Sequence, residues 1–266
     1  MRATKYYFPN QVIQQMNIPF TVKIATTDPD DIVMTQLKSA STKINEKLAQ
    51  IDQTFSPFRF DSLVSKYQRG DNNPLLYSSD FQSVYGQTIL AEQMTDGIFT
   101  PYFAGRYDPT GLVKGWAIEQ SFDEFLMPLL EDTNIDGVSL NGGGDLKFAT
   151  KPSSDFHWGI GIENPHNLQK VIATYYLQNG AIATSGNSKR GEHIIRKYPS
   201  DVQQVTVVSD SLVDADIWAT VGVAAGLAKF TDFVNEYKLS GMLINGNHAP
   251  INFNEGTIAN AQKTPL

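Results

Sequence analysis

The spacing of apolar residues predicts a long amphipathic helix over residues 28–55. Its apolar positions recur at intervals of three and four and include Ile32, Val33, Leu37, Ile44, Leu48 and Ile51. We expect Asp28 to cap this helix, because Asp accepts hydrogen bonds from free N–H groups, and Pro29 suits the first helical position. Asp30 and Asp31 add negative charge where the helix dipole favours it.

Two further helices are predicted downstream. One is expected to begin with Ser79 as its cap and to end before Gly97. The residues that it would turn inward are Phe81, Val84, Tyr85, Ile89 and Leu90. The other follows Gly111 and runs towards Glu131.

The middle of the chain has the composition of β-strands. Short segments rich in β-branched and aromatic residues occupy residues 138–140, 158–162, 171–177 and 204–208. Asn179-Gly180 is a strong two-residue hairpin signal and leads into a further strand at residues 181–184. A second such signal, Asn245-Gly246, separates apolar residues 242–244 from residues 249–253.

Helices come first along the chain and hairpin-linked strands follow, which favours an α+β fold over a doubly wound parallel sheet. We therefore expect a mixed, hairpin-rich β-sheet packed with several long helices. The turn-rich residues 68–74 are interpreted as a loop within one domain, and residues 1–266 as a single domain.

Composition narrows the function without identifying it. The 266 residues carry a net charge of −7 and are 41% hydrophobic, so no basic surface for nucleic acid is expected. The absence of cysteine excludes disulfides, thiolate metal sites and cysteine nucleophiles. No apolar run is expected to reach the length of a membrane span.

Residues 1–10 lack the apolar stretch of a secretory signal, and without cysteine they offer no lipoprotein anchor. We expect a cytoplasmic protein on this basis. The alternative is an exported protein whose sequence is trimmed here.

Asp216 and Thr220 provide the first candidate site. Residues four apart share one face of a helix, so their oxygens can hold one small cation. Oxygen ligands favour a hard ion such as Mg²⁺, which in proteins commonly bridges one or two carboxylates and substrate phosphates. The alternative is that Asp214 or Asp216 simply caps the helix that follows residues 209–211.

Gly111 and Lys114 provide a second candidate. A helix that opens at Gly111 would present free N–H groups to an anion, and Lys114 would offer a point charge to a diphosphate. The alternative is an ordinary helix start with a solvated lysine. The glycine pattern of a P-loop is absent from the sequence.

Two turn-like segments follow predicted strands. In NGGGD at residues 141–145 the glycines would let the backbone approach a ligand closely, although they suit a plain turn equally well. In ATSG at residues 183–186 Thr184 could donate to a phosphate, although Thr-Ser-Gly is also common in turns. His193 can accept a proton near neutral pH, or it only hydrogen-bonds neighbouring backbone. No zinc site is expected from the four histidines.

Taken in order, these segments resemble the ApbE family of flavin transferases, which attach FMN from FAD to a threonine of another protein. The matching segments lie at residues 16–20, 58–62, 95–99, 108–115, 140–145, 183–186 and 193–195, and end at the Asp216/Thr220 pair. The resemblance implies an ApbE/T-fold-like architecture, FAD as substrate, Mg²⁺ as cofactor and an acceptor protein that bears a target threonine.

The resemblance also assigns roles. The Gly111 carbonyl becomes the third protein ligand of Mg²⁺ beside Asp216 and Thr220, while Asp108 contacts the nucleotide and Lys114 lies near its phosphates. Candidate base residues are His193 and Asp145. The other implied nucleotide contacts are Met16, Phe58, Ile98, Phe99, Thr100, Thr184 and Ile195. Met and aromatic residues suit flat rings, but each is also a common core residue.

The sequence departs from the family pattern at three places. Arg196-Lys197 stands where relatives have Asp-Pro, Thr100 where they have Asp, and Thr110-Gly111 where they have two glycines. Nucleotide binding is therefore better supported than transfer. The rival functions are an FAD pyrophosphatase that gives FMN and AMP, and a noncatalytic FAD-binding protein.

Overall fold

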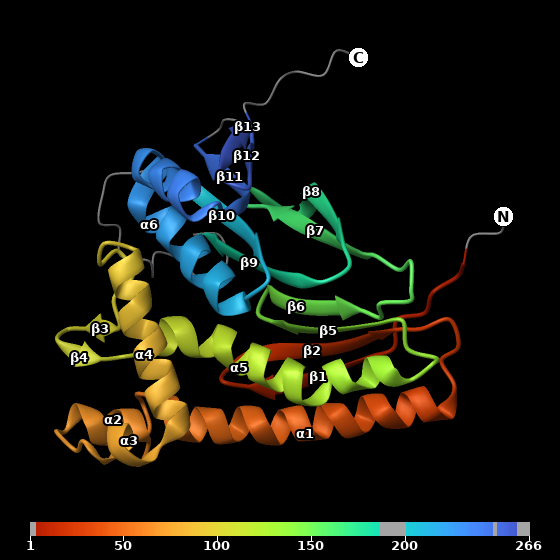
Figure 1. Ribbon diagram of the computed structural model, residues 1–266, viewed down its shortest axis with the longest axis horizontal. Helices are drawn as coiled ribbons and strands as arrows, with labels where there is room; N and C mark the ends of the chain where they lie inside the picture. Colours follow the sequence, from red (N-terminus) through yellow and green to blue (C-terminus); the bar gives the residue numbers. More distant parts are fainter. Residues whose placement is uncertain (1–3, 187–200, 247–248, 260–266) are drawn as a thin grey trace.

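One β-sheet forms the centre of the protein (Figure 1). The computed structural model describes residues 4–186, 201–246 and 249–259. Within these residues the sheet has nine strands in the order β1-β2-β5-β6-β9-β10-β11-β12-β13. The strands are β1 (Asn10–Gln15), β2 (Ile18–Ala25), β5 (Gly137–Gly142), β6 (Asp145–Thr150), β9 (Gly180–Gly186), β10 (Val202–Ser209), β11 (Ser240–Asn245), β12 (Ile251–Asn254) and β13 (Thr257–Ala259). The predicted α+β class is confirmed. We expected a mixed sheet, and each of the pairings between these strands is antiparallel.

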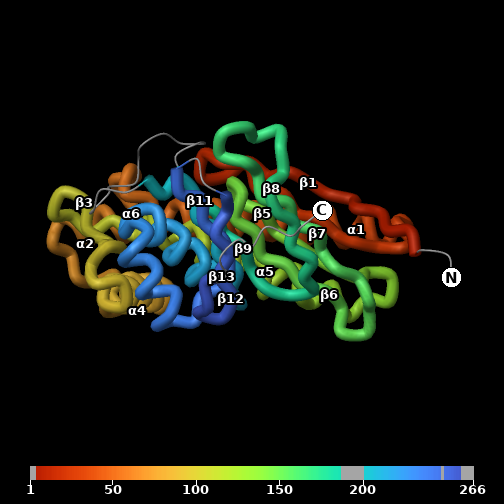
Figure 2. The backbone as a smooth tube through the Cα atoms, turned by 90° about the horizontal axis from the view of Figure 1, so that it is seen from above, coloured from red at the N-terminus to blue at the C-terminus, as the bar shows by residue number. Residues whose placement is uncertain are grey.

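Helices and two small ribbons complete the fold. The helices are α1 (Asp31–Phe55), α2 (Leu63–Gln68), α3 (Asn73–Tyr77), α4 (Ser79–Met94), α5 (Thr110–Phe125), the 3₁₀ helix η1 (Met127–Glu131) and α6 (Leu212–Tyr237). The ribbons pair β3 (Tyr102–Phe103) with β4 (Arg106–Tyr107), and β7 (Trp158–Asn164) with β8 (Asn167–Leu177). In Figure 2 the helical end with α2, α4 and β3 lies opposite the end where α1 begins.

The two faces of the sheet bury separate hydrophobic clusters. Successive residues of a strand point to opposite faces, so Ala181 and Ala183 of β9 join the larger cluster under the helices, while Ile182 joins the smaller one. The smaller cluster includes Phe156 and Trp158, at the start of the β7–β8 ribbon. One face therefore meets α1, α5 and α6, and the other meets the ribbon.

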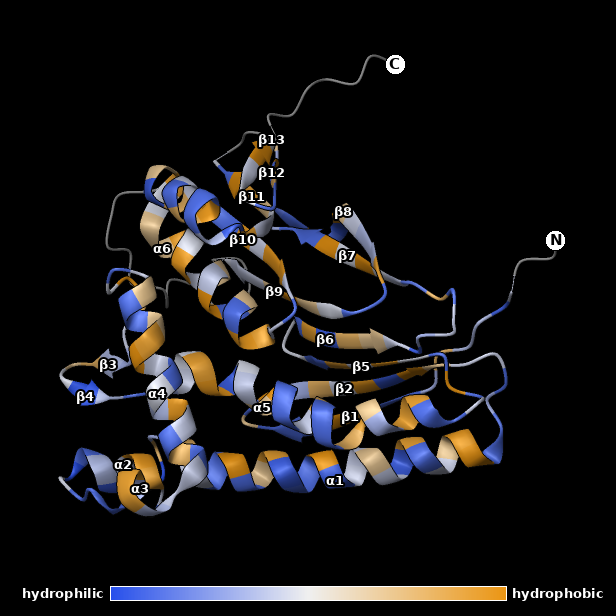
Figure 3. Cartoon of the chain, viewed as in Figure 1, coloured by the Kyte–Doolittle hydropathy of each residue, from blue (hydrophilic) through white to orange (hydrophobic). Residues whose placement is uncertain are grey.

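The first predicted helix forms, but its cap differs from the expectation. Asp30, not Asp28, accepts the hydrogen bond from the Val33 N–H at 2.8 Å, and α1 begins at Asp31. The backbone N–H of Asp28 instead donates to the Thr26 hydroxyl. The buried positions of α1 follow the predicted spacing, and Figure 3 shows apolar and polar bands alternating along it.

The next two helices are confirmed with small shifts. Ser78 rather than Ser79 caps α4, which ends at Met94, and the Gly97 N–H then donates to the Glu92 carbonyl at 2.8 Å. The third predicted helix is α5 followed by η1. The α-helix ends at Phe125, close to Pro128, which has no N–H to continue it.

The hairpin predicted at Asn179-Gly180 is wrong. The strand before it, β8, pairs with β7, and the strand after it, β9, pairs with β6 and β10. The chain crosses here from the ribbon to the sheet. The Asn179 side chain accepts a hydrogen bond from the Thr150 N–H at 3.0 Å, so it ties the crossing to the end of β6.

The second hairpin signal is confirmed as a strand pairing, because β11 and β12 are antiparallel partners. Their connection is longer than the two residues Asn245-Gly246, since β12 begins at Ile251. A further two-residue turn joins β1 to β2 at Met16 and Asn17, which both have positive φ (49° and 60°).

Helix α6 follows β10 as predicted and is rich in apolar residues. It meets the length and composition of a membrane span, which corrects the expectation that no apolar run would do so. However, 67% of its most apolar window is buried inside the protein, against β9 and β10, as in the core helix of a globular fold. Gly226 interrupts it with a non-helical backbone (φ 77°, ψ 169°), so α6 is two helical segments joined at a kink.

Candidate functional site

Three charged side chains from α5, β6 and α6 meet on the face of the sheet that the helices cover. The Lys114 ammonium of α5 contacts Asp145 Oδ2 at the start of β6 and lies 3.3 Å from Asp216 Oδ2 on α6. The two carboxylate side chains are only 4% and 8% exposed, and the lysine side chain 20%. We call Lys114, Asp145 and Asp216 the charged cluster.

The start of α6 lies close to α5, and this approach brings the cluster together. A Cβ at Gly115 would meet the Leu212 carbonyl oxygen and Val213 Cα at 3.4 Å, so the two helices are in van der Waals contact beside Lys114. A side chain larger than a methyl group at Gly115 would push the helices apart.

The alternative that Asp214 or Asp216 caps α6 is wrong. Ser211 caps α6, because its hydroxyl accepts the hydrogen bond from the Asp214 N–H at 3.2 Å. Glu119 of α5 also accepts from the Leu212 N–H, at 2.8 Å. Asp216 lies beyond this cap as a buried carboxylate within the helix.

Hydroxyl groups lie beside the cluster. Thr220, one turn after Asp216, is 2.9 Å from the Ser185 hydroxyl on β9. The neighbouring Thr184 donates its backbone N–H to Asp145 Oδ1 at 3.2 Å. Its hydroxyl lies on the opposite face of the sheet, 2.9 Å from that of Thr206. Strand β9 therefore links Thr220 of α6 to the carboxylate of β6.

The glycines of NGGGD form the turn of the β5–β6 hairpin. Gly143 and Gly144 have positive φ (66° and 110°), and the Gly144 N–H donates to the Asn141 side chain at 3.2 Å. Gly142 packs so closely that a Cβ there would lie 2.7 Å from Phe20 and 2.8 Å from Ile118. Gly143 and Gly144 thus form a turn, as the plain-turn interpretation expects, and this turn places Asp145 at the first position of β6. Close approach of a ligand to these glycines stays a prediction.

Asp108 and Gly111 lie at the N-terminal end of α5. The Asp108 side chain accepts a hydrogen bond from the Thr110 N–H at 3.0 Å, and α5 begins at Thr110, one residue before Gly111. A Cβ at Gly111 would lie 3.2 Å from the ring of Phe99, so this ring covers the helix start. Gly111 and Lys114 are three residues apart and share one side of α5.

Other expected nucleotide contacts lie on separate elements. Met16 is in the β1–β2 turn, Phe58 is 91% exposed between α1 and α2, and Ile98 lies in the connection after α4. The Thr100 hydroxyl donates to Glu92 at 2.6 Å. His193 and Ile195, together with the altered Arg196-Lys197 segment, lie outside the described residues. The roles assigned to all of these residues stay predictions.

A cavity of about 180 Å³ lies on the other face of the sheet, between the main strands and the β7–β8 ribbon. The β5–β6 turn and Thr184 form part of its wall. Its other lining residues include Leu146, Ile160, Ile162, Glu163, Leu168, Ile182 and Gln204. Sequence reasoning did not identify this cavity, because the ribbon's position over the sheet is a tertiary feature. Its only local signal is the apolar alternation at Ile160 and Ile162.

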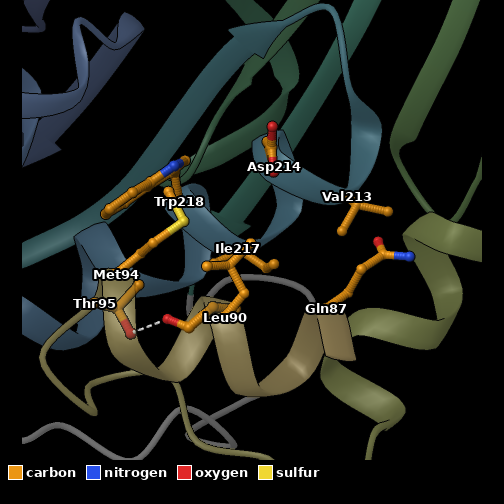
Figure 4. Close-up of a pocket in the computed structure, with 9 residues that line it drawn as sticks. Gln87, Leu90, Met94, Thr95, Val213, Asp214, Ile217 and Trp218 are labelled. Carbon is orange, nitrogen blue, oxygen red and sulfur yellow. Dashed lines mark hydrogen bonds between the residues drawn. The ribbon is translucent and has the colours of Figure 1, made fainter. Parts of the chain in front are cut away.

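A smaller groove of about 50 Å³ separates α4 from α6 (Figure 4). Leu90 and Met94 of α4 face Ile217 and Trp218 of α6 across it. Asp214 also borders the groove, where desolvation and the nearby Glu119 raise the pKa of its carboxyl group.

The oxygen donors around Asp216 suit a hard cation. Asp216 is a buried carboxylate, and Thr220 and Ser185 add hydroxyls. Within residues 4–186, 201–246 and 249–259 no group of three or more His, Cys, Asp or Glu side chains is arranged to hold a metal. A cation here would therefore need hydroxyl, carbonyl and substrate oxygens as well, which is how Mg²⁺ is commonly held.

Comparison with known proteins finds a flavin transferase among the similar sequences. The FAD:protein FMN transferase of Klebsiella pneumoniae is 24% identical over 157 residues, which cover 54% of this chain and 46% of that protein. The match thus spans about half the length of this relative.

Solved structures show the same fold over nearly the whole chain. The flavin transferase ApbE from Vibrio cholerae has a TM-score of 0.68 at 17% identity and covers 92% of this chain and 96% of its own. The ApbE protein of Thermotoga maritima has a TM-score of 0.72 at 20% identity, with 94% and 97% covered. The sequence model of the ApbE family matches residues 104–243, which hold the charged cluster, Thr220 and the β5–β6 turn. The chain therefore belongs to the ApbE family.

Proposed function

We propose that this protein transfers the FMN part of FAD to a threonine of an acceptor protein in a Mg²⁺-dependent reaction that releases AMP. The observation that carries the proposal is the convergence of Lys114, Asp145 and Asp216 beside the Thr220 hydroxyl and the start of α5. Family membership and the name of the Klebsiella relative support the same activity.

In the proposed reaction the acceptor threonine oxygen attacks the phosphorus on the riboflavin side of the FAD diphosphate. A new P–O bond joins FMN to the threonine, and the bond from that phosphorus to the bridging oxygen breaks. The bridging oxygen leaves with AMP, and the threonine proton passes to a base. Positioning and charge stabilisation supply most of the rate enhancement in such phosphoryl transfers.

The residues of the site divide this work. Asp216, Thr220 and the Gly111 carbonyl would hold Mg²⁺, which would draw charge from the diphosphate oxygens and stabilise the departing AMP. Lys114 would place a positive charge beside the diphosphate, and the first turn of α5 would present its N–H groups to it.

The contacts of Asp145 help to choose between the two candidate base residues, His193 and Asp145. Its Oδ1 accepts the Thr184 N–H and its Oδ2 contacts the Lys114 ammonium, so both oxygens are engaged. Protonation of Asp145 would remove the negative charge that pairs with the Lys114 ammonium, which disfavours Asp145 as the base. We therefore assign the base role to His193, and to Asp145 the positioning of Lys114.

The test is incubation of the purified protein with FAD and Mg²⁺, with and without an acceptor that bears a target threonine. Flavin fluorescence on the acceptor together with equimolar AMP is the expected result. Free FMN and AMP without labelled acceptor would identify a pyrophosphatase instead, and intact FAD a binding protein.

A matched pair of variants tests the metal site. Asp216→Asn removes a buried ligand charge, and we expect it to lower the transfer rate at least about 100-fold, since Mg²⁺ stabilises the transition state by several kcal/mol. Asp214→Asn changes the same residue type two positions earlier on α6, outside the cluster, and should keep most of the rate. Equal rates in the two variants would remove Asp216 from the mechanism.

A further inference from the structure

The position of the Lys114 ammonium raises the question of how a cation reaches Asp216. The ammonium lies 3.3 Å from Asp216 Oδ2 and also contacts Asp145, so it is bound at the carboxylate that the proposed metal needs. Lys114 is carried on α5, three residues after Gly111, whose carbonyl is the other expected ligand. The lysine and the expected carbonyl ligand are thus both carried by α5.

Buried carboxylates require positive charge nearby, and two of them in one place require it more strongly. The Lys114 ammonium supplies such charge to Asp145 and Asp216 before a divalent ion binds. A divalent ion that ligates Asp216 would lie within a few ångströms of this ammonium, where like charges repel strongly at low dielectric.

We propose that Lys114 is an internal counter-ion that is exchanged for the divalent cation. Without the metal the ammonium pairs with both carboxylates, and on metal binding it moves away from Asp216 while Asp145 keeps it in the site. Lysine suits this exchange because its charge is compact and its four-carbon stem is flexible.

The exchange couples metal binding to diphosphate binding. Metal binding alone must displace the ammonium, whereas a diphosphate bound at the same time offers the displaced ammonium a new anionic partner. Each ligand then strengthens the binding of the other by the same factor, as linkage requires. This consequence rests on the proposed function, but the competition between Lys114 and the metal can be measured without FAD.

The experiment is a titration of the unliganded protein with Mg²⁺, followed by isothermal calorimetry and by the thermal unfolding midpoint. Lys114→Met removes the competing charge and keeps the length of the side chain. We expect its Mg²⁺ dissociation constant to be at least about tenfold lower than that of the wild type. Lys114→Arg keeps the charge and should show no such tightening.

Lys147→Met is the matched control for net charge. Its substitution changes the protein charge by the same amount as Lys114→Met. Lys147 lies on β6 and contacts Glu119 at 3.5 Å and the Asp210 carbonyl, not the charged cluster. Tightening in Lys114→Met but not in Lys147→Met supports the exchange. Equal dissociation constants in the two variants, or weaker binding in Lys114→Met, would overturn it.

Lys114→Met leaves two buried carboxylates without this lysine and so risks misfolding. Recovery of a cooperative unfolding transition on adding Mg²⁺ would itself support the exchange. If the variant does not fold at any Mg²⁺ concentration, Lys114→Met with Asp145→Asn is compared with Asp145→Asn alone, and the same tightening is expected. Its absence there overturns the proposal.

The two proposals can fail separately. Tighter Mg²⁺ binding in Lys114→Met with no transfer activity in the wild type would retain the exchange and reject the transferase. Transfer activity with unchanged Mg²⁺ affinity would do the reverse.

Discussion

Two kinds of residue matter most in this protein. The first kind is a glycine at a position where a side chain would not fit, and the second kind is a buried charged residue. Lys114 is an example of the second kind. Its sequence context suggests a solvated lysine at a helix start, yet its ammonium is placed between Asp145 and Asp216. The cost of leaving either carboxylate without positive charge explains why such a lysine is held in the site.

Gly142 is an example of the first kind, and it leads to a prediction. Gly142→Ala would bring a Cβ within 2.7 Å of Phe20 and 2.8 Å of Ile118, both of them buried. Overpacking of this kind typically costs about 1–3 kcal/mol, so we expect a loss of that size in the free energy of unfolding measured in urea.

Gly86→Ala is the control for this prediction. Gly86 lies in α4, and a Cβ there has no neighbour within 4 Å. Alanine should raise stability at this helical position by roughly 0.5–1 kcal/mol. A Gly142→Ala protein as stable as the wild type would mean that Phe20 and Ile118 move aside without cost.

At the scale of elements, the contact between α5 and α6 determines where Asp216 lies. Glu119 of α5 accepts hydrogen bonds from the Leu212 N–H at 2.8 Å and the Ser211 hydroxyl at 3.4 Å, and Lys147 lies 3.5 Å away. Its negative charge is placed at the positive end of the α6 dipole. The start of α6 is thus held by a neighbouring helix as well as by its own cap.

We expect Glu119→Ala to lower the free energy of unfolding by about 1–2 kcal/mol, the usual cost of a lost N-terminal cap. It should also increase amide hydrogen exchange in the first turns of α6. Glu119→Gln keeps an acceptor oxygen and should lose less. Hydrogen exchange in α6 that is the same in all three proteins would show that Ser211 suffices to hold the helix start.

At the scale of the whole molecule, hydrogen bonds join segments far apart in sequence at the end opposite α2 and α4. Asp132, after η1, accepts from the Asn134 N–H at 2.8 Å and from Gln36 of α1 at 2.9 Å, and the Lys151 ammonium contacts the Asp132 carbonyl at 2.7 Å. The Asn134 N–H, then the Gln36 side chain, and with them the charge of Lys151, lower the pKa of the Asp132 carboxyl group below its ordinary value of 3.8.

This shift predicts a pH dependence. A lowered folded-state pKa gives stability that is present above 3.8 and is lost as the pH falls through the folded-state value. Asp132→Asn should therefore be less stable than the wild type at neutral pH, and the difference should shrink below about pH 3.8. Urea unfolding of both proteins between neutral and strongly acidic pH measures this difference. A constant difference over the whole range would assign it to packing instead.

The lengths of the helices follow largely from local sequence. The apolar spacing of α1 and α4 predicts both helices, while their caps lie one or two residues from the expected positions because several Ser and Asp residues compete at each start. Asp216 and Thr220 of the candidate site were also recognised locally, since they are four apart on one helix, whereas Asp145 was named only through the family resemblance. The surroundings of Asp216 and Thr220 were not recognised, because α5, β6 and β9 supply them from other parts of the chain.

The sequence by itself predicted the long helices and several strands, because side-chain periodicity, caps and turn residues act within a few positions. It did not predict β1, β2 and β6 or the short helices α2 and α3. The tertiary structure decided which strands pair. It placed β8 beside β7 although Asn179-Gly180 favours a local hairpin, since burial of Trp158, Ile162 and Ile182 against one another depends on the whole sheet. It also decided that Lys114 would meet Asp145 and Asp216. A buried charge selects its partner by proximity in space, which no spacing along the chain encodes.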